Sequence, residues 1–301
     1  MKRKDINPLL MEQYERLQAE EKRARKLLGQ LYKSSSARIR TIAASLFHDC
    51  TTGEHVNHAA LFRTIKPAQA MDLQRQTAQA RRVYGDMAAA DFPFTVTRFD
   101  RLNRLDAARA QLILNELDTA AEIDSMLYIH IHAHVMMTMA ATIGYLELQD
   151  FKMTEKMADA ATRNDERPVI CSLYEQHRAA GEREATLLQQ AMTRGEDADK
   201  AAALVTDYAE KRAQSNTDRL MFTEDTRATA EAVREVVKDY VEAFYTVCIH
   251  DDKTCSTCTG IAAEQQMDPV PIEDFKPGIT APPFHPWCRC GIEVVWLADE
   301  V

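Results

Sequence analysis

The sequence APPFHPWCRCG, residues 281–291, contains three prolines, a histidine, a tryptophan and two cysteines. Proline opposes helix formation because it lacks a backbone N–H and its ring clashes with the preceding turn. Upstream, DDKTCSTCTG at 251–260 places Cys255 and Cys258 three positions apart, so that both thiolates can point into one tight turn. Together the two stretches read C-x2-C, 26 intervening residues, and H-x2-C-x-C.

This spacing predicts a structural zinc site. Thiolate and imidazole are the ligands that Zn²⁺ prefers, and a tetrahedral structural site needs four of them. The expected ligands are Cys255, Cys258 and His285, with Cys288 or Cys290 as the fourth. Cys288 has the more usual spacing from the histidine, whereas Cys290 precedes a glycine with a freer backbone, so the choice stays open. Buried thiols without a metal are the alternative, and four protein ligands would leave no open position for catalytic water.

Composition predicts a helix-rich body. Nine Gly in 301 residues is about half the usual share of roughly 7%. The expected fold is mainly α, with a long helical body and a small C-terminal, zinc-stapled, proline-rich α+β module. Four of the seven cysteines lie within 36 residues, which fits metal ligation in a reducing cytosol better than a disulfide framework. Cys50, Cys171 and Cys248 are expected to be free thiols.

The N-terminal region is expected to form a helical arm. Residues 8–33 place apolar side chains at alternating steps of three and four, as in a helix that packs one stripe on a partner. The serines at 34–36 are expected to end this helix and cap a second one through Ile39, Ile42 and Leu46. The residues expected to bind a partner are Leu10, Leu17, Leu28 and Leu31.

Further breaks divide the rest of the chain. They fall at the polar run 50–56, at Phe-Pro-Phe 92–94 and at 163–169. Helices are expected from Asn103 onward, over 172–193, and over 196–245 after Gly195, and residues 291–297 are expected to form a closing strand. The predicted regions are an N-terminal helical arm (1–90), a central helical region (91–180) and a C-terminal domain (181–301), the last with helices over 181–245 and the Cys/His module over 246–297.

The segment SMLYIHIHAHVMMTMAATIGYL, residues 125–146, contains no charged Asp, Glu, Lys or Arg and is long enough to span a bilayer. Its histidines, threonines and tyrosines suit lipid poorly, so we predict a buried central helix and no membrane contact. His130 and His134 share a helix face, but the glutamate of an HExxH metalloprotease is missing after the first histidine. We therefore interpret His130, His132 and His134 as core or inter-helix hydrogen-bonding residues.

Neither catalysis nor a nucleic-acid-binding surface over the whole protein is indicated. The chain has no phosphate-binding glycine loop and no nucleophile elbow, so we expect no enzyme activity and no small-molecule substrate. In a zinc deaminase the histidine ligand precedes the C-x2-C pair, whereas here His285 follows Cys255 and Cys258, so that class of enzyme is excluded. The net charge of −9 argues against a surface built for phosphate binding. Residues 1–40 carry eleven Lys or Arg against five acids, so any DNA contact would be local to them.

Three segments taken in order resemble the phage Mu F-like head morphogenesis family, minor capsid proteins of tailed phages and prophages. They are RL-x-FTEDTR (219–227), DDKTC-x2-C (251–258) and PPFHPWCRC (282–290). The resemblance covers roughly residues 185–296 and includes AMTRGED around Gly195. It departs at YTVCIHDD, where many relatives carry Trp before the Asp. The motif residues carried over are Thr223, Glu224, Arg227, Asp252, Pro283 and Arg289, although Glu224 and Arg227 could equally be a surface pair.

The resemblance implies a low-copy protein at the portal vertex that acts in procapsid assembly and in DNA packaging or delivery, without catalysis by this domain. The implied partners are the portal protein and other capsid components. The implied location is the virion, in the capsid interior or at the portal vertex, with host cytoplasm during assembly.

Two alternatives come from other functional classes. Some relatives carry this domain fused to toxin enzymes, which suggests a prophage-borne effector or toxin carrier. A zinc-ribbon nucleic-acid binder is the second alternative, and the few basic residues of the module, Lys253, Lys276 and Arg289, count against it.

Overall fold

The structure is a computed structural model that describes residues 8–52, 55–146, 152–163, 169–248 and 254–297. The chain is mainly helical and divides into two compact units. Unit 1 comprises Met1–Lys26, Met126–Asp165 and Asn216–Val301, and unit 2 comprises Leu27–Ser125 and Glu166–Ser215. Both units therefore combine segments that are far apart in the sequence, unlike the consecutive regions 1–90, 91–180 and 181–301 that we predicted.

Three long helices contribute residues to both units. They are α1 (Pro8–Cys50), α4 (Arg104–Tyr145) and α7 (Ala198–Val237). The expected break at 34–36 is wrong, because α1 continues through the serines. Ser35 and Ser36 are buried. The Ser35 hydroxyl forms hydrogen bonds with Glu116 and Asn115 of α4 and does not cap a helix end.

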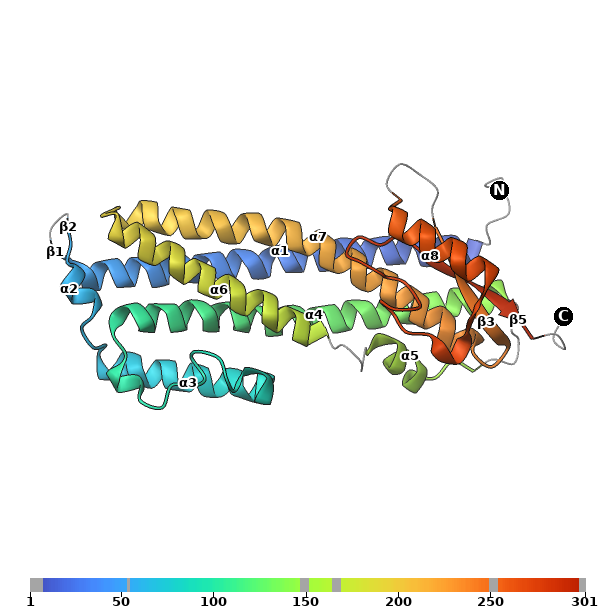
Figure 1. The fold of residues 1–301 in the computed structure, drawn as a ribbon, viewed down its shortest axis with the longest axis horizontal. Coiled ribbons are helices and arrows are strands. Elements are labelled where there is room, and N and C mark those ends of the chain that lie inside the picture. The colour runs from blue at the N-terminus through green and yellow to red at the C-terminus, as the bar shows by residue number, and fades with distance from the viewer. Residues whose placement is uncertain (1–7, 53–54, 147–151, 164–168, 249–253, 298–301) are drawn as a thin grey trace. The chain divides into compact units, whose positions relative to one another are not determined.

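Unit 2 also contains short elements and one further long helix, and its helices and strands are labelled in Figure 1. These are β1 (Thr51–Thr52), β2 (His55–Val56), α2 (His58–Leu61), α3 (Pro67–Tyr84), the 3-10 turns η1 (Gly85–Ala88) and η2 (Phe99–Arg101), and α6 (Val169–Thr193). As predicted, Asn103 opens α4, and its side-chain oxygen accepts the N–H of Asp106 at 2.8 Å. Gly195, with φ +72°, links α6 to α7, a left-handed conformation that glycine adopts without strain.

The main core of unit 2 is formed where α1, α4, α6 and α7 meet. It includes Phe47, Leu112, Leu188 and Val205, all at most 1% exposed. Helices α6 and α4 pack very closely at Gly181, since a Cβ built on this residue would lie 2.6 Å from the Cα of Ile113. Glycine at this position is therefore what permits the close packing of the two helices.

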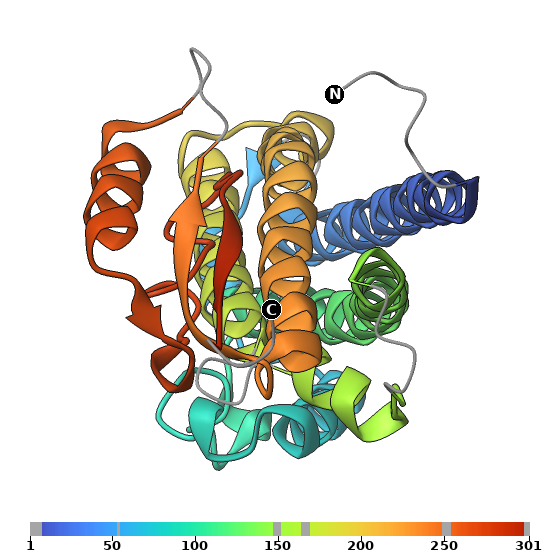
Figure 2. The same cartoon turned by 90° about the vertical axis from the view of Figure 1, so that its right-hand side faces the viewer.

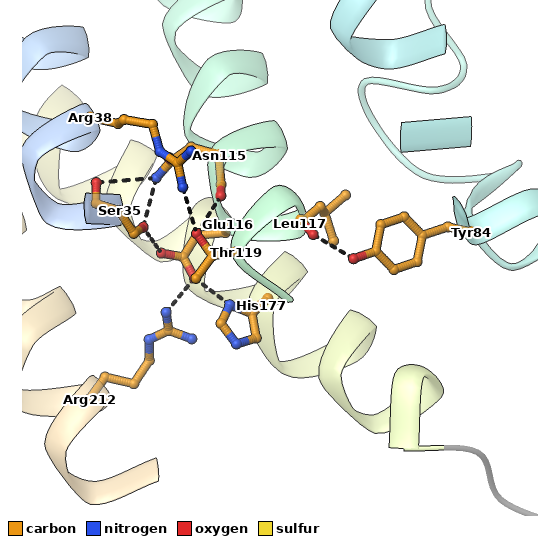
Figure 3. Close-up of polar contacts among 9 residues, drawn as sticks. All are labelled: Ser35, Arg38, Tyr84, Asn115, Glu116, Leu117, Thr119, His177 and Arg212. Atoms are coloured by element: carbon orange, nitrogen blue, oxygen red, sulfur yellow. Dashed lines mark hydrogen bonds and ion pairs between the residues drawn. The ribbon is translucent and has the colours of Figure 1, made fainter. Parts of the chain in front are cut away.

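A buried polar cluster lies inside the same helices (Figure 3). Glu116 of α4 is 1% exposed and accepts hydrogen bonds from Ser35 Oγ at 3.3 Å and from His177 Nδ1 at 2.7 Å. It also pairs with the guanidinium of Arg212. Asn115 donates from Nδ2 to Ser35 Oγ at 2.9 Å. The cluster thus joins α1, α4, α6 and α7 through side chains that composition alone would place on the surface.

Two buried carboxyl groups of unit 2 have opposite protonation behaviour. Burial by itself would raise the pKa of Glu116, but the His177 hydrogen bond and the Arg212 charge outweigh it and hold the pKa at about 2. Burial raises the pKa of Glu184 well above 4.5, and the neighbouring Glu116 charge raises it further. Because of these shifts, Glu116 is ionised and Glu184 favours its neutral form.

Unit 1 combines helix ends with a small sheet. Its further elements are α5 (Glu155–Thr162), β3 (Val241–Val247), α8 (Ser256–Met267), β4 (Val270–Pro271), η3 (Ile272–Asp274) and β5 (Gly291–Trp296). The strands form an antiparallel sheet in the order β4-β3-β5. Figure 2 shows β3 and β5 between α8 and the C-terminal part of α7.

The sheet has its own small core. Phe244, Phe275 and Ala281 pack with Ala230 of α7, and the two phenyl rings lie 5.2 Å apart. On the other side, the side chain of Gln265 on α8 accepts the N–H of Thr246 at 2.9 Å. The C-terminal module is therefore covered by α7 and is not packed on itself alone.

Two sequence predictions about this region have different outcomes. The closing strand is confirmed as β5. The prediction of helix up to residue 245 is wrong, because α7 ends at Val237 and β3 follows it. Val241, Phe244 and Thr246 are buried in β3, with a bulge after Val241 that interrupts the simple alternation of the strand.

Among the described residues, one helical stretch, Arg104–Gly144, is long and apolar enough to cross a bilayer by length and composition alone. In its most apolar window 28% of the residues are buried, which is less than the central buried helix that we expected. Tyr128 and Ile129 are exposed on it, at 38% and 70%. Core helices of other proteins meet the same criterion, so the finding carries no further conclusion.

Candidate metal centre

The C-x2-C pair lies in the first turn of α8. Cys255 is the N-cap residue, and its Sγ accepts the backbone N–H of Cys258 at 3.4 Å. This N–H and the His285 ring lower the pKa of the Cys255 thiol, and the net result is about 7 against the opposing effect of burial. The N-terminus of a helix stabilises negative charge, so the position of Cys255 favours its thiolate, which is the form that binds metals.

The second pair of donors comes from a tight turn. The N–H of Cys288 donates to the carbonyl of His285 at 3.1 Å, with Pro286 and Trp287 between them. Trp287 has φ +67°, the left-handed conformation needed at the third position of a type II turn, and Pro286 is favoured at the second position. His285 Nδ1 lies 2.7 Å from the Pro286 carbonyl, so a proton on Nδ1 leaves the Nε2 lone pair for a metal.

The turn and the helix bring five donors together, here called the Cys/His centre: Cys255, Cys258, His285, Cys288 and Cys290. His285 Nε2 lies 3.1 Å from the Sγ of both Cys255 and Cys258. Cys258 Sγ lies 3.8 Å from Cys288 Sγ. Two sets of three donors result, Cys255–Cys258–His285 and Cys258–Cys288–Cys290, and within each set all donor atoms lie within 4.8 Å of one another.

These distances fit a tetrahedral ion. With Zn–S bonds of about 2.3 Å and Zn–N bonds of about 2.0–2.1 Å, neighbouring ligand atoms are about 3.5–3.8 Å apart. The sulfur–sulfur distance of 3.8 Å matches this edge, and the 3.1 Å contacts are shorter than it by a few tenths of an ångström. The residues predicted from the sequence can therefore hold a metal ion with only small side-chain adjustments.

A further thiol lies beside the Cys/His centre. Cys248 is a free thiol, as predicted together with Cys50 and Cys171, but its proximity to the centre was not foreseen: its Sγ lies 3.3 Å from Cys290 Sγ. Burial raises the pKa of Cys290, and its hydrogen bond to Cys248 raises it further. Burial likewise raises the pKa of Cys258, to about 12. Cys248 follows β3 directly, and its position only seven residues before Cys255 is the sequence signal that could have indicated its proximity.

The Cys/His centre is attached to α7 by the segment that carries the Thr-Glu motif. Thr226 Oγ1 donates to the Cys288 carbonyl at 3.0 Å, and Thr223 Oγ1 accepts the Trp287 N–H at 3.4 Å. The rings of Phe222 and Trp287 lie 5.8 Å apart. Residues more than sixty positions apart in the sequence therefore meet on one face of α7. Thr226 was not among the predicted site residues.

Glu224 and Arg227 are not a surface pair. Arg227 Nε bonds Glu224 Oε2 at 2.9 Å, and their side chains are 4% and 15% exposed. The guanidinium also donates to the carbonyls of Ala161 and Thr162, at 3.3 and 2.9 Å. These are carbonyls at the C-terminal end of α5, so Arg227 caps that helix and complements its dipole.

The other predicted residues have simpler positions. Pro283 is partly buried and follows a cis peptide bond with Pro282, and Arg289 is partly buried. Asp252 lies outside the described residues.

The leucines expected to bind a partner all lie on α1. The side chains of Leu10 and Leu17 are outside what the structure describes. Leu31 is partly buried, whereas Leu28 is fully buried and packs within the chain, so it offers no surface to a partner.

The histidine interpretation is confirmed for two positions. His130 Nε2 lies 2.9 Å from Asp225 Oδ1, and His134 Nε2 lies 2.8 Å from Thr229 Oγ1. Both contacts join α4 to α7 within unit 1. Burial lowers the pKa of His134, which favours its neutral form despite the nearby Asp225.

Comparison of the chain with protein-family models, with curated proteins and with solved structures found no match.

Proposed function

We propose that the Cys/His centre holds one structural Zn²⁺ through Cys255, Cys258, His285 and Cys288. Three thiolates and one imidazole are a usual donor set for a closed zinc site. Cys288 is the preferred fourth ligand because its Sγ lies at tetrahedral-edge distance from Cys258 Sγ, whereas the Sγ of Cys290 is 3.3 Å from Cys248 Sγ, outside the proposed set. The zinc ion would cross-link the turn His285–Cys288 to the first turn of α8 and would have no role in catalysis.

We further propose that the chain is a phage head morphogenesis protein of the Mu F-like type, a minor capsid component. The observation that carries this proposal is the contact between its motif segments. Thr223 and Thr226 of the FTEDTR segment bond the backbone of the PPFHPWCRC segment, and Arg227 of the same segment anchors α5. A shared packing role gives a physical reason for these motifs to occur together, which supports the resemblance.

On this proposal the portal vertex is the docking partner. The protein would act in procapsid assembly and in DNA packaging or delivery, located in the virion and, during assembly, in host cytoplasm. Its long helices suit binding to other capsid proteins, and the net charge of −9 fits a protein that contacts proteins first. The basic residues 1–40 are the place where a local DNA contact would form.

The proposal is tested by purifying the protein with its native partners and quantifying chains and metal by mass spectrometry. The expected result is a ring-forming portal chain with a smaller number of copies of this protein, each with one zinc at its Cys/His centre. Zinc without any capsid component would contradict the capsid proposal. Copurification with an enzyme domain would favour the effector carrier, and salt-dependent DNA binding by the protein would favour the nucleic-acid binder.

A Cys255→Ser variant separates the metal from the partner. Loss of one zinc ligand should expose the C-terminal module to protease while far-UV circular dichroism of the long helices stays largely unchanged. Val83→Ser, an exposed position on α3, is the control and should leave protease resistance intact. Equal resistance of the Cys255→Ser variant and the control would contradict the structural zinc.

A further inference from the structure

Two short helical faces meet in unit 1, away from the Cys/His centre. Tyr128 and His132 are one turn apart on α4, and Glu155 and Asp159 are one turn apart on α5. Residues four positions apart lie on the same side of a helix, so each pair forms a ridge. His132 Nε2 lies 3.2 Å from Glu155 Oε1 and 3.7 Å from Asp159 Oδ1. The three donor atoms lie within 4.8 Å of one another.

The orientation of the imidazole distinguishes this group from an ordinary ion pair. His132 Nε2 is buried, yet it forms no hydrogen bond with any residue that the structure describes, although a carboxylate oxygen is 3.2 Å away. A buried nitrogen without a bond is costly unless another partner occupies that position. The three donor atoms lie close enough together to share one metal ion, which would give His132 Nε2 the partner that it lacks.

We propose that His132, Glu155 and Asp159 form a second metal site, for a first-row divalent cation such as Mn²⁺ or Zn²⁺. One imidazole and two carboxylates suit both of these ions, whereas the thiolates of the Cys/His centre favour Zn²⁺ over Mn²⁺. Three protein ligands leave coordination positions for water. The side chains of His132, Asp159 and Glu155 are 21%, 40% and 73% exposed, so an ion can enter from solvent.

The surroundings hold the donors in position. Tyr128 donates its hydroxyl proton to Asp159 Oδ1 at 2.8 Å, which orients one carboxylate, and its ring lies 6.1 Å from that of His132. Thr154 caps the first turn of α5 by accepting the N–H of Met157 at 3.3 Å. Arg227 caps the other end of the same helix. A ligand pair on a helix capped at both ends is more exactly placed than one on a loop.

The site has a structural consequence for α5. This helix has only eight residues, and isolated helices of that length are marginal in water. A metal ion shared by α4 and α5 would fix α5 against α4 at its N-terminal end, complementing the Arg227 cap at its C-terminal end. We therefore assign the ion a role as a clip between the two helices.

The test uses the full chain with one equivalent of Zn²⁺ already bound at the Cys/His centre. MnCl₂ is added, and free Mn²⁺ is followed by its electron paramagnetic resonance signal. We expect one Mn²⁺ per chain, with a pulsed resonance signature of one coordinated imidazole nitrogen. His132→Ala should remove that signature, and His132→Ala or Asp159→Asn should raise the Kd at least about tenfold. Asp239→Asn, an exposed carboxylate in unit 1, is the matched control and should leave the Kd unchanged.

Thermal unfolding in the absence of Mn²⁺ checks that each variant is folded, and Mn²⁺ should raise the Tm of the parent chain but not of His132→Ala. Two outcomes would overturn the proposal. In the first, neither Mn²⁺ nor a second equivalent of Zn²⁺ binds, and the three residues form only an ion pair. In the second, binding persists unchanged in both ligand variants. Neither outcome bears on the Cys/His centre or on the capsid proposal, whose readouts are separate.

Discussion

Replacing Glu116 by Gln should strongly destabilise unit 2, because it removes a charge that the fold requires. The substitution preserves volume but leaves the mostly buried Arg212 guanidinium, 12% exposed, without its anionic partner. The pKa of Glu116 is held at about 2 against an ordinary value of 4.5. At about 1.4 kcal/mol per pKa unit this corresponds to about 3 kcal/mol of stabilisation by the charged form. Breaking a buried ion pair costs about 3–5 kcal/mol in general, which agrees.

The same substitution at Glu184 is the matched control, since it changes a carboxyl to an amide in the same core. Glu184 favours its neutral form because burial and the Glu116 charge raise its pKa. Glutamine resembles that neutral form, so Glu184→Gln should cost little at pH 5 and should stabilise the protein at higher pH. Two chemically identical substitutions are thus expected to have opposite effects.

The pH dependence gives a second readout. A lowered pKa contributes stability that is present above pH 4.5 and lost as the pH falls toward 2, so the parent chain should lose the Glu116 contribution in that window and Glu116→Gln should not. A raised pKa contributes stability that is present below pH 4.5 and lost as the pH rises through the folded-state value. Glu184→Gln should remove that decline. Urea unfolding from pH 2 to 9 measures both effects, and equal destabilisation by the two variants at pH 7 would refute the assignment of charges.

Three further substitutions test the packing. Gly181→Ala should destabilise the protein by about 1–3 kcal/mol in urea unfolding, because the new Cβ would lie 2.6 Å from the Ile113 backbone; no loss would mean that α4 and α6 are farther apart. Arg227→Met should cost about 3–5 kcal/mol by leaving Glu224 unpaired, and hydrogen exchange should show faster exchange in α5; unchanged exchange there would exclude the cap. Thr226→Val should weaken zinc binding about tenfold or more in a chelator competition, because the Cys288 carbonyl loses its hydrogen bond. Equal zinc affinity of the variant and the parent would show that this contact with α7 does not support the Cys/His centre.

Local signals in the sequence were sufficient for several elements. Asn103 carries a cap side chain, Gly195 supplies a left-handed helix end, and the apolar run before the C-terminus forms β5, as predicted. The grouping of Cys255, Cys258 and His285 also follows from spacing, because a C-x2-C pair fits the first turn of a helix. Each of these features depends on residues close together in the chain.

The features that were missed depend on partners far away in the chain. The serines at 34–36 read as a helix stop, but Ser35 bonds Glu116 and Asn115 across the core, so α1 continues. Strand β3 was read as helix because its bulge interrupts the alternation of buried residues. Arg227 looked like half of a surface pair, and only the fold brings the end of α5 to it. Helix periodicity alone contains no information about such contacts.

The most direct test of the central claim is X-ray absorption at the zinc edge on the purified chain. A His132→Ala background keeps the second proposed site out of the spectrum. We predict one zinc per chain with three sulfur ligands at about 2.3 Å and one nitrogen at about 2.0–2.1 Å. In that background Cys288→Ser should lower the sulfur count to two, and Cys290→Ser should leave it at three. A chain without zinc, or zinc bound only by nitrogen and oxygen, would contradict the account.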